Sequence, residues 1–492
     1  LDHATRVLRI GPFAMIPSYF MFMPGVLPLA DAEGHAATHP EVSAATTGLF
    51  AALLVLMILA LAFEEKLHAR KSIITGVFAA VCLLLGAACD LLPFGAMVNS
   101  LGESIEMPVF IPAIDWGVMV IIFGAGLFVD VTSKSGIFTW IAIKLTKASR
   151  GDPIRLLIYY GVMTVVFSAM LNNVTAMIIV GSLTAVSLTK LNRGDALLGF
   201  LLIEGLLTNV GGLLTLISSV PNIIVGNIAG ISFVRFFLVA APYVVVATAM
   251  TIWLGRRIFR IESPATEAER QAAATLVTGF DENDGIESRR FFNFCLGVFV
   301  LFVIALSTTS ILPYARHLGM GYVALTFAII VLLAFRSEVG RFYAAVDWDL
   351  LGFFACLFVV INVMEHAQVL ALLGRGIGLL IALGDMAGPA ALTAGAAVAS
   401  SVTDNIPLSA MLAKILAADA TPAESPLWWC VIFGSNLGGN ITPIGSASTV
   451  VAVTIIHKHK LNLSFAGFVK AAVPFAALQI ALATIYVLVF LR

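Results

Sequence analysis

The sequence carries little charge. Only 12% of its 492 residues are charged, whereas 60% are hydrophobic, and the mean hydropathy is +1.01. Soluble domains usually carry about a quarter charged residues. The net charge of −1 also lacks the basic excess that nucleic-acid binding requires. This composition excludes a nucleic-acid partner and predicts an all-α polytopic protein in the lipid bilayer of the cell (inner) membrane.

Paired cysteines and the motifs of common enzymes are also absent. The five cysteines are scattered through apolar segments, without a Cys-x-x-Cys pair or a Cys/His cluster at metal-ligand spacing. The sequence contains no P-loop, no Gly-x-Ser-x-Gly and no HExxH. We therefore expect no enzyme, no metal and no cofactor. ATP could drive this protein only through an accessory ATPase subunit.

Long apolar runs dominate what is present. A helix needs about 20 apolar residues to cross roughly 30 Å of hydrocarbon. The clear candidates are 44–63, 73–93, 116–133, 155–171, 231–254, 291–312, 319–335, 348–366 and 468–491. Further apolar stretches, interrupted by Asn, Gly, Pro, Ser and Thr, are 172–189, 196–230, 389–416 and 427–455.

The N-terminal residues 1–32 fit two interpretations. Two arginines precede an apolar stretch and a small-x-small pattern, as in a secretory signal peptide. The alternative is an extra N-terminal helix, which three prolines within the stretch disfavour.

Lysine and arginine predict the orientation of the spans. Lys66, Arg70 and Lys71 place the end of the first span inside the cell. The one long polar linker, 256–290, holds six arginines and is therefore predicted to be cytoplasmic. It divides the chain into two halves.

The two halves are related. Residues 134–155 hold five Lys or Arg, whereas the matching stretch 366–387 holds one, so the halves are predicted to cross the membrane in opposite directions. The sequence therefore indicates an inverted-topology repeat. The matches are Asp115-Trp116 with Asp347-Trp348 and Asn172-Asn173 with Asp404-Asn405, both at the same offset in numbering, and Asn209 with Asn436, at a slightly shorter offset.

Polar breaks inside the apolar segments predict the substrate site. Non-helical backbone at membrane depth survives only inside protein or beside a cavity, and side chains at such breaks can cap helix ends or hold a solute. The alternative is a set of capped kinks and glycine-mediated helix contacts without a ligand. The candidate substrate-binding residues are Asn172, Asn173, Thr175, Asn209, Asp404, Asn405, Asn436 and Thr442.

Two acids are candidates for proton coupling. Asp404 lies within a break, and the next basic residue along the chain is Lys414. An intramembrane carboxylate predicts a functional site by default. Glu204 lies one turn before Thr208-Asn209 and could titrate, although an interhelical role explains it equally well.

These motifs resemble those of the ArsB/NhaD permeases of the ion transporter superfamily, which include arsenite efflux pumps, NhaD-type sodium/proton antiporters and the P protein. The resemblance covers roughly 45–480 and rests on several short motifs. They are Ser-Arg-Gly at 149–151, Ser168-Ala-Met-Leu-Asn-Asn-Val-Thr175, Thr208-Asn-x-Gly-Gly212, Pro221-Asn222, Asp404-Asn-Ile-Pro407 and Gly438-Gly-Asn-x-Thr-x-Ile-Gly445.

The resemblance implies two inverted repeats with paired re-entrant hairpins, a scaffold domain beside a transport domain, elevator-like movement and, in many members, a homodimer. On that basis we expect scaffold helices at 44–113 and 291–345. The two repeats are expected at 114–250 and 346–492.

The resemblance is less decisive about substrate. Asn172-Asn173 stands where the P protein and NhaD-type members tend to carry Asp-Asn, and Ser218-Ser-Val-Pro-Asn222 replaces the P-protein-like Gly-Asp-Pro-Pro-Asn. Fewer acids favour an uncharged oxyacid, so the first expectation is efflux of arsenite or antimonite in exchange for protons. The stretch Glu64-Glu-x-Leu-His-x-Arg-Lys-Ser72 resembles the sodium/proton branch, and sodium/proton antiport or transport of another inorganic or organic anion stays open.

Overall fold

The computed structural model describes residues 42–98, 102–336 and 339–491. The predicted signal peptide or extra helix at 1–32 lies outside the described residues. Within the described chain, eleven helices are long and apolar enough to cross a membrane. The described chain departs from an all-α fold at one short antiparallel hairpin, formed by β1 (Ala96–Val98) and β2 (Ser104–Glu106).

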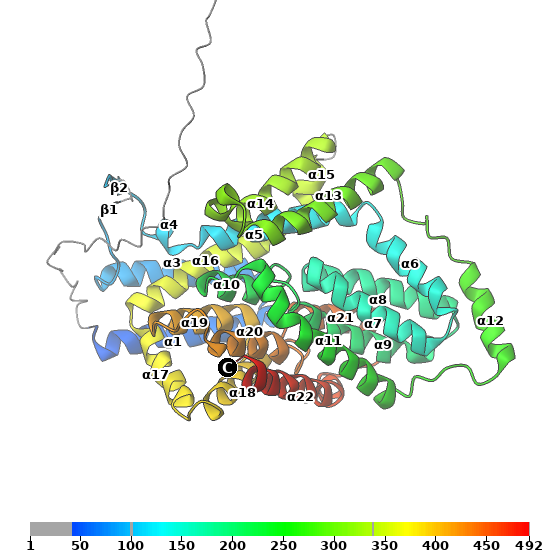
Figure 1. Ribbon diagram of the computed structural model, residues 1–492. Coiled ribbons are helices and arrows are strands. Elements are labelled where there is room, and N and C mark those ends of the chain that lie inside the picture. Colours follow the sequence, from blue (N-terminus) through cyan, green and yellow to red (C-terminus); the bar gives the residue numbers. More distant parts are fainter. Residues whose placement is uncertain (1–41, 99–101, 337–338, 492) are drawn as a thin grey trace, which may run out of the picture. The chain divides into compact units, whose positions relative to one another are not determined.

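Helices occur at all nine of the predicted spans, and the interrupted stretches are helices separated by breaks (Figure 1). The elements up to the linker are α1 (Ala44–Ala62), α2 (Glu64–Leu67), α3 (Lys71–Ala88), α4 (Phe110–Ala113), α5 (Trp116–Ser133), α6 (Ile137–Ser149), α7 (Pro153–Met170), α8 (Asn173–Lys190), the 3-10 turn η1 (Gly194–Ala196), α9 (Leu197–Gly211), α10 (Val220–Ile228) and α11 (Phe233–Ile258). The elements from the linker onward are α12 (Glu267–Thr278), α13 (Arg289–Thr308), α14 (Pro313–Ala334), α15 (Val339–Ala345), α16 (Trp348–His366), α17 (Val369–Ile381), α18 (Ala387–Val402), α19 (Asn405–Ala418), α20 (Pro426–Gly438), α21 (Ala447–Lys458) and α22 (Phe465–Phe490).

The sequence duplication appears as matched helices. The first residues of the two helices differ by the same number in the pairs α5/α16, α6/α17, α8/α19 and α11/α22. In the pair α10/α21 this difference in residue number is slightly smaller. Both long last helices contain a proline at the matched positions Pro242 and Pro474. The direction in which each segment crosses the bilayer, and with it the inverted topology and the domain boundaries, stays a prediction.

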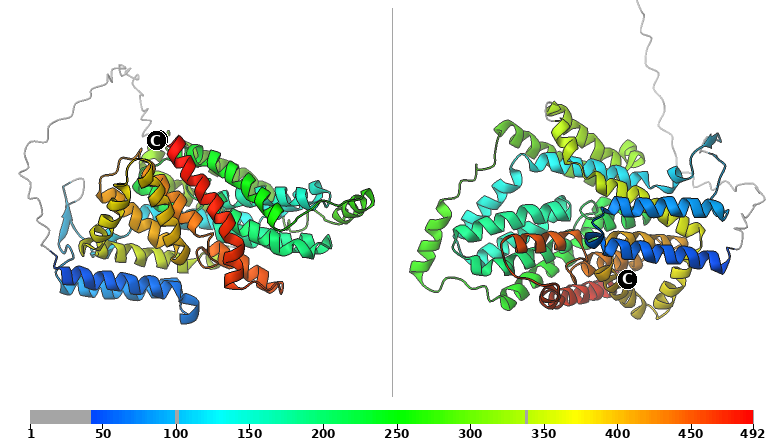
Figure 2. Two further views of the ribbon diagram at one scale, coloured as in Figure 1. Left: turned by 90° about the horizontal axis from the view of Figure 1, so that it is seen from below. Right: turned by 180° about the vertical axis from the view of Figure 1, so that it is seen from behind.

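Packing between the helices follows the same duplication. α7 packs on α9 as α18 packs on α20, and α5 packs on α14 as α16 packs on α3. The short helix before the long last helix of each repeat packs against the other repeat: α10 contacts α19 and α20, and α21 contacts α8 and α9. The figures agree, with α10 beside α19 in Figure 1 and the blue α1 and α3 side by side in Figure 2. This exchange brings the breaks of both repeats together.

The linker folds as a short helix that is tied to the first repeat. α12 begins at a capping box formed by Thr266 and Glu269. Ser263 donates a hydrogen bond to the N-cap carboxylate of Asp152, and Lys147 forms an ion pair with Glu282.

Candidate functional site

The first pair of breaks positions two helix N-termini. α7 ends at Met170 and α18 at Val402, and the next helix in each repeat begins with an N-cap. Asn172 Oδ1 accepts a hydrogen bond from the Thr175 backbone N at 2.7 Å, and Asp404 Oδ1 accepts one from the Ile406 N at 3.0 Å. Asx side chains are favoured at such caps because they satisfy backbone N–H groups that the helix leaves unpaired. Capping therefore occupies one oxygen of each side chain.

Serine and threonine tie each first break to the neighbouring helix. Ser168 donates to the Thr208 carbonyl at 2.6 Å, and the matched Ser400 donates to the Ser435 carbonyl at 2.5 Å. Thr442, one of the predicted binding residues, donates to the Ser401 carbonyl at 2.6 Å. Its hydroxyl stabilises the break rather than lining the main cavity.

An amide network joins the two repeats in the interior. Asn209 Nδ2 donates to Asn440 Oδ1 at 2.8 Å and to Ser446 Oγ at 2.9 Å. Its Oδ1 accepts from Asn173 Nδ2 at 3.3 Å and from Ser448 Oγ at 3.0 Å. All the hydrogen-bonding capacity of Asn209 is thus used within the protein.

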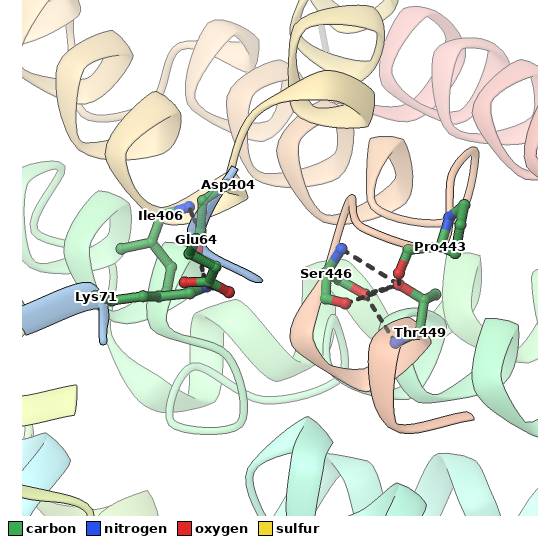
Figure 3. Close-up of polar contacts among 7 residues, drawn as sticks. All are labelled: Glu64, Lys71, Asp404, Ile406, Pro443, Ser446 and Thr449. Atoms are coloured by element: carbon green, nitrogen blue, oxygen red, sulfur yellow. Dashed lines mark hydrogen bonds and ion pairs between the residues drawn. The ribbon is translucent and has the colours of Figure 1, made fainter. Parts of the chain in front are cut away.

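The second break of the later repeat is held by its own capping box. Ser446 and Thr449 exchange backbone-to-hydroxyl hydrogen bonds of 3.3 Å, and the Thr449 hydroxyl also bonds the Pro443 carbonyl at 3.1 Å (Figure 3). This cap holds Ser446 where it meets Asn209 of the other repeat.

Asn436 has no free amide group. Its Oδ1 accepts from Ser219 Oγ at 2.7 Å, and its Nδ2 donates to Asn222 Oδ1 at 3.0 Å and to the Ile432 carbonyl at 2.8 Å. The side chain is fully buried. Asn436 therefore connects the repeats, away from the main cavity.

A cavity of about 690 Å³ lies where the breaks meet. Five predicted binding residues line it: Asn172, Asn173, Thr175, Asn209 and Asn405. Asp404, Asn436, Thr442 and Glu204 are not among its lining residues. The structure thus brings five of the predicted residues from both repeats to one cavity.

Two polar side chains on this wall remain available to a solute. The Asn405 amide and the Thr175 hydroxyl make no hydrogen bond with another described side chain or backbone group, although Asn405 is only 8% exposed. Because these groups line the cavity and have hydrogen-bonding capacity left over, the position favours a ligand or water contact. Asn173, the counterpart of Asn405, is instead bonded to Ser168 and Asn209.

Lys71 joins the site from a distant part of the chain. Its Nζ lies 2.5 Å from Asp404 Oδ2, across 333 residues of sequence, and 3.9 Å from Glu64 Oε1 (Figure 3). In the sequence, Lys71 indicated the orientation of the first span, and Asp404 had no cation nearby along the chain. The one signal for this contact was the resemblance of the stretch around 64–72 to the sodium/proton branch.

Other charged side chains surround the cavity. Carboxylates outnumber cations on its wall, because Arg70 and Lys71 are the only described Lys or Arg lining it. Asp347 caps α16 through the Leu350 N. The four carboxylate residues are Glu64, Asp130, Asp347 and Asp349.

Glu204 lies apart from this cavity, in the core of α9. The side chain is fully buried, and Oε1 accepts a hydrogen bond from Thr184 at 2.6 Å. Its Oε2 is, among the described residues, the buried side-chain oxygen without a hydrogen-bond partner. A buried charge without a partner is unfavourable, so this environment favours the protonated acid.

A second cavity of about 420 Å³ lies on the other side of Asp404. Its wall comes from α1, α17, α18 and α19 and is almost wholly apolar, with Thr403 and Asp404 as its polar members. Asp404 thus lines the apolar cavity, whereas its partner Lys71 lines the polar one.

Comparison with known proteins agrees with this architecture. Residues 58–434 match the family described as CitMHS, citrate transporter. An uncharacterized transporter of Mycobacterium bovis is 31% identical over 379 residues, which are 76% of this chain and 86% of that protein. The human P protein is 25% identical over 508 residues, covering 87% of this chain and 60% of the P protein.

A solved structure shows the fold. MtrF of Neisseria gonorrhoeae, described in connection with a class of antimetabolite efflux pumps, superposes with a TM-score of 0.53. The match covers 90% of this chain and 94% of MtrF at 13% identity. At this identity the likeness concerns the fold alone.

Proposed function

The chain belongs to the CitMHS (citrate transporter) family of membrane transporters, and from this premise we propose that it exports a small hydroxylated oxyacid, arsenite or antimonite first, in exchange for protons. Transport as such follows from the family. The substrate, the direction of transport and the coupling ion are our proposal, as is the assignment to the ArsB/NhaD branch.

The observation that carries the proposal is a pair of neutral polar side chains on the cavity wall. Asn405 and Thr175 come from different predicted repeats, line the same cavity and have hydrogen-bonding groups that no other described residue uses. The hydroxyls of an uncharged trihydroxide such as arsenite could donate to and accept from such groups. The excess of carboxylates on the wall disfavours a multiply charged anion.

Proton coupling is assigned to Asp404, with Glu204 as the second candidate. Asp404 stands at a break beside the substrate cavity, whereas Glu204 lies in the core of α9. A carboxylate that alternates between a proton and another partner can couple the movement of the proton to the movement of the substrate.

The test is flux in proteoliposomes that contain the purified protein. We expect an imposed proton gradient to drive accumulation of arsenite at least about tenfold above protein-free vesicles, and an uncoupler to abolish it. Equal arsenite flux with and without protein would overturn the proposal. Sodium and citrate are measured in parallel under the same gradient.

A citrate-type carboxylate is the second candidate. It is favoured by the description of the family and by Arg70, which lines the cavity and makes no ion pair with another described residue. Arginine recognises carboxylates through paired hydrogen bonds. Citrate accumulation that Arg70→Gln abolishes, without any arsenite flux, would establish this function in place of the first.

A further inference from the structure

We infer that Lys71 is a tethered counter-ion that competes with the transported proton for Asp404, so that the proton binds only when the break at 403–404 separates from the start of α3. Lys71 is therefore a positioning residue of proton coupling. The inference rests on the proposed role of Asp404 and adds a residue that no motif in the second repeat indicates.

The first support is the geometry of the pair. Lys71 is the first residue of α3, and Asp404 is the N-cap of α19, so the contact joins two elements that are otherwise far apart in the chain. The two side chains are 28% and 14% exposed, and the polar atoms are 2.5 Å apart. Such a contact is stronger than an exposed ion pair, because less water screens it.

The second support is the position of the pair between two different environments. Lys71 lines the polar cavity of about 690 Å³, and Asp404 lines the apolar cavity of about 420 Å³. If the pair separates, Asp404 is left against an apolar wall, where a charged carboxylate is unfavourable. Separation of the pair and uptake of a proton by Asp404 are therefore linked.

The groups around the pair are consistent with this competition. Glu64 lies 3.9 Å from Lys71 Nζ, and Asp349, which accepts a hydrogen bond from Ser72, also attracts the ammonium. Once Asp404 is protonated, these two carboxylates can hold the released ammonium. Arg70 and His68 are the other basic side chains that line the same cavity, and within the described chain neither forms an ion pair with Asp404.

The third support comes from the duplication inside the chain. Gly124 and Cys356 are matched positions, and so are Val120 and Gly352, at the same offset as the two Asn motifs. In the first repeat Gly124 packs on Leu325 and Val120 on Gly321; in the second, Cys356 packs on Gly76 and Gly352 on Ser72. Leu325 and Gly321 of α14 therefore correspond to Gly76 and Ser72 of α3. The difference in residue number is the same for both correspondences, so the two helices are matched as well.

This register places Met320 at the position that corresponds to Lys71. Asn172 corresponds to Asp404. The second repeat and the helix that packs on it thus carry a carboxylate and a cation at these two positions, and the first repeat and its packing helix carry neither. The two charges occur together, which is expected if they serve each other.

Formation of the pair is thereby linked to the affinity for the proton. A state with the pair formed holds the proton weakly, because the ammonium must leave first, and a state with the pair separated holds it strongly. A carrier that alternates between such states takes up a proton in one and releases it in the other. Substrate movement can then be coupled to this alternation without a direct contact between the substrate and the proton.

The experiment compares charge-altering variants of the full-length protein in proteoliposomes. Lys71→Met should displace the pH profile of arsenite flux to alkaline pH and reduce proton-driven accumulation at least tenfold, while Lys71→Arg restores both. The double variant Lys71→Met/Asp404→Asn carries the neutral residues that stand at the matched positions, Met320 and Asn172. It should retain downhill exchange and lose its pH dependence.

Lys414→Met is the matched control. Lys414 is on α19 as well, and its exposed pairing with Glu365 at 3.5 Å lies away from both cavities. It should leave the pH profile unchanged. If Lys71→Met does not fold, Lys71→Cys in a Cys89→Ser background can be treated with an ethylammonium methanethiosulfonate, which restores the positive charge in the folded protein and should restore the profile.

The outcomes separate this inference from the proposed function. Wild-type flux without proton dependence would refute the coupling proposal itself. Proton-driven wild-type flux together with an unchanged profile in Lys71→Met, or a profile in Lys71→Arg displaced as far as that of Lys71→Met, would refute the role of Lys71 alone.

Discussion

Asn405 and Asn436 belong to the same predicted set of binding residues, and the structure gives them different surroundings. The Asn405 amide faces the cavity without a partner in the described chain, whereas Asn436 is fully bonded between the repeats. Both are asparagines of a duplicated motif, but Asn405 begins α19 and Asn436 lies within α20. Residue type alone did not distinguish them.

This difference predicts opposite phenotypes. Asn405→Ala should lower arsenite flux about tenfold, the loss of roughly one good hydrogen bond, and leave thermal stability unchanged. Asn436→Ala should lower the free energy of unfolding by about 1–3 kcal/mol, because Asn222 and Ser219 lose their partner. Flux assays and thermal unfolding in detergent measure both. A destabilised Asn405→Ala with normal flux would contradict the assignment.

Glu204 is the other acid whose role a single substitution can decide. Its carboxyl is buried and absent from the wall of the cavity, and among the described residues Thr184 is its one hydrogen-bond partner, through Oε1. Glu204→Gln keeps the shape and removes the possibility of a buried charge. We expect equal or higher thermal stability and a normal pH dependence of flux. Loss of proton-driven flux in this variant, with downhill exchange retained, would instead make Glu204 the proton carrier.

Among the helices, glycines set the distance at which neighbours pack. A Cβ on Gly211 would lie 2.7 Å from Val165 Cα, and one on Gly438 would lie 2.7 Å from Ser400 Cβ. Contacts this short do not occur between such atoms, so only glycine permits α7 to pack on α9 and α18 on α20. The glycines of the motifs thus serve packing.

Gly438→Ala should therefore destabilise the protein by about 1–3 kcal/mol, the usual cost of overpacking, and reduce its yield from membranes. Gly376→Ala in α17 is the matched control, since nothing lies within 4 Å of a Cβ there. Alanine is also the better helix former. Thermal unfolding of the two variants provides the test, and equal melting temperatures would refute the packing role.

The linker provides a pH-dependent prediction. The hydrogen bond and charge of Lys147 hold the pKa of Glu282 below its ordinary value of 4.5. A lowered carboxyl pKa means that the contact stabilises the attached linker above pH 4.5 and is lost as the pH falls through the lowered pKa. Cleavage of residues 279–288 by a protease that is active at both acid and neutral pH, scaled to its cleavage of an unstructured peptide, should therefore rise as the pH drops below about 4.5.

Glu282→Gln is the control for this effect. The variant lacks the charged contact at every pH, so it should be cleaved at the elevated rate already at neutral pH. A wild-type cleavage rate in the variant at neutral pH would show that the ion pair does not hold the linker.

For the molecule as a whole, the duplication predicts that matched surface positions face opposite sides of the membrane. Lys144 on α6 and Gly376 on α17 are exposed and occupy matched positions of the two repeats. In a cysteine-less background, Lys144→Cys should react with an impermeant thiol reagent only from the cytoplasmic side. Gly376→Cys should react only from the outside. Labelling of both from one side would show that the repeats are parallel, not inverted.

The linear properties of the chain were sufficient to predict its helices and membrane spans. Hydropathy placed helices at the spans, the repeated offset between the halves predicted the matched elements, and polar residues within apolar runs predicted the breaks at Asn172 and Asp404. These features follow from local rules, because a backbone in lipid must form helices and a break must be capped. The resemblance to the ion transporter superfamily was confirmed at that level, and its ArsB/NhaD branch stays a prediction.

The roles of individual side chains could not be predicted from local sequence, because they depend on contacts between distant segments of the chain. The partner of Asp404 is Lys71, 333 residues away, and the partners of Asn436 come from the other repeat. Such pairs form only when α10 and α21 exchange between the repeats and α3 begins beside the break of α19. Local sequence thus determined where polar groups enter the membrane. Packing between the halves decided which of them bond to protein and which are left for a solute, because hydrogen-bonding capacity used inside the protein is no longer available to a ligand.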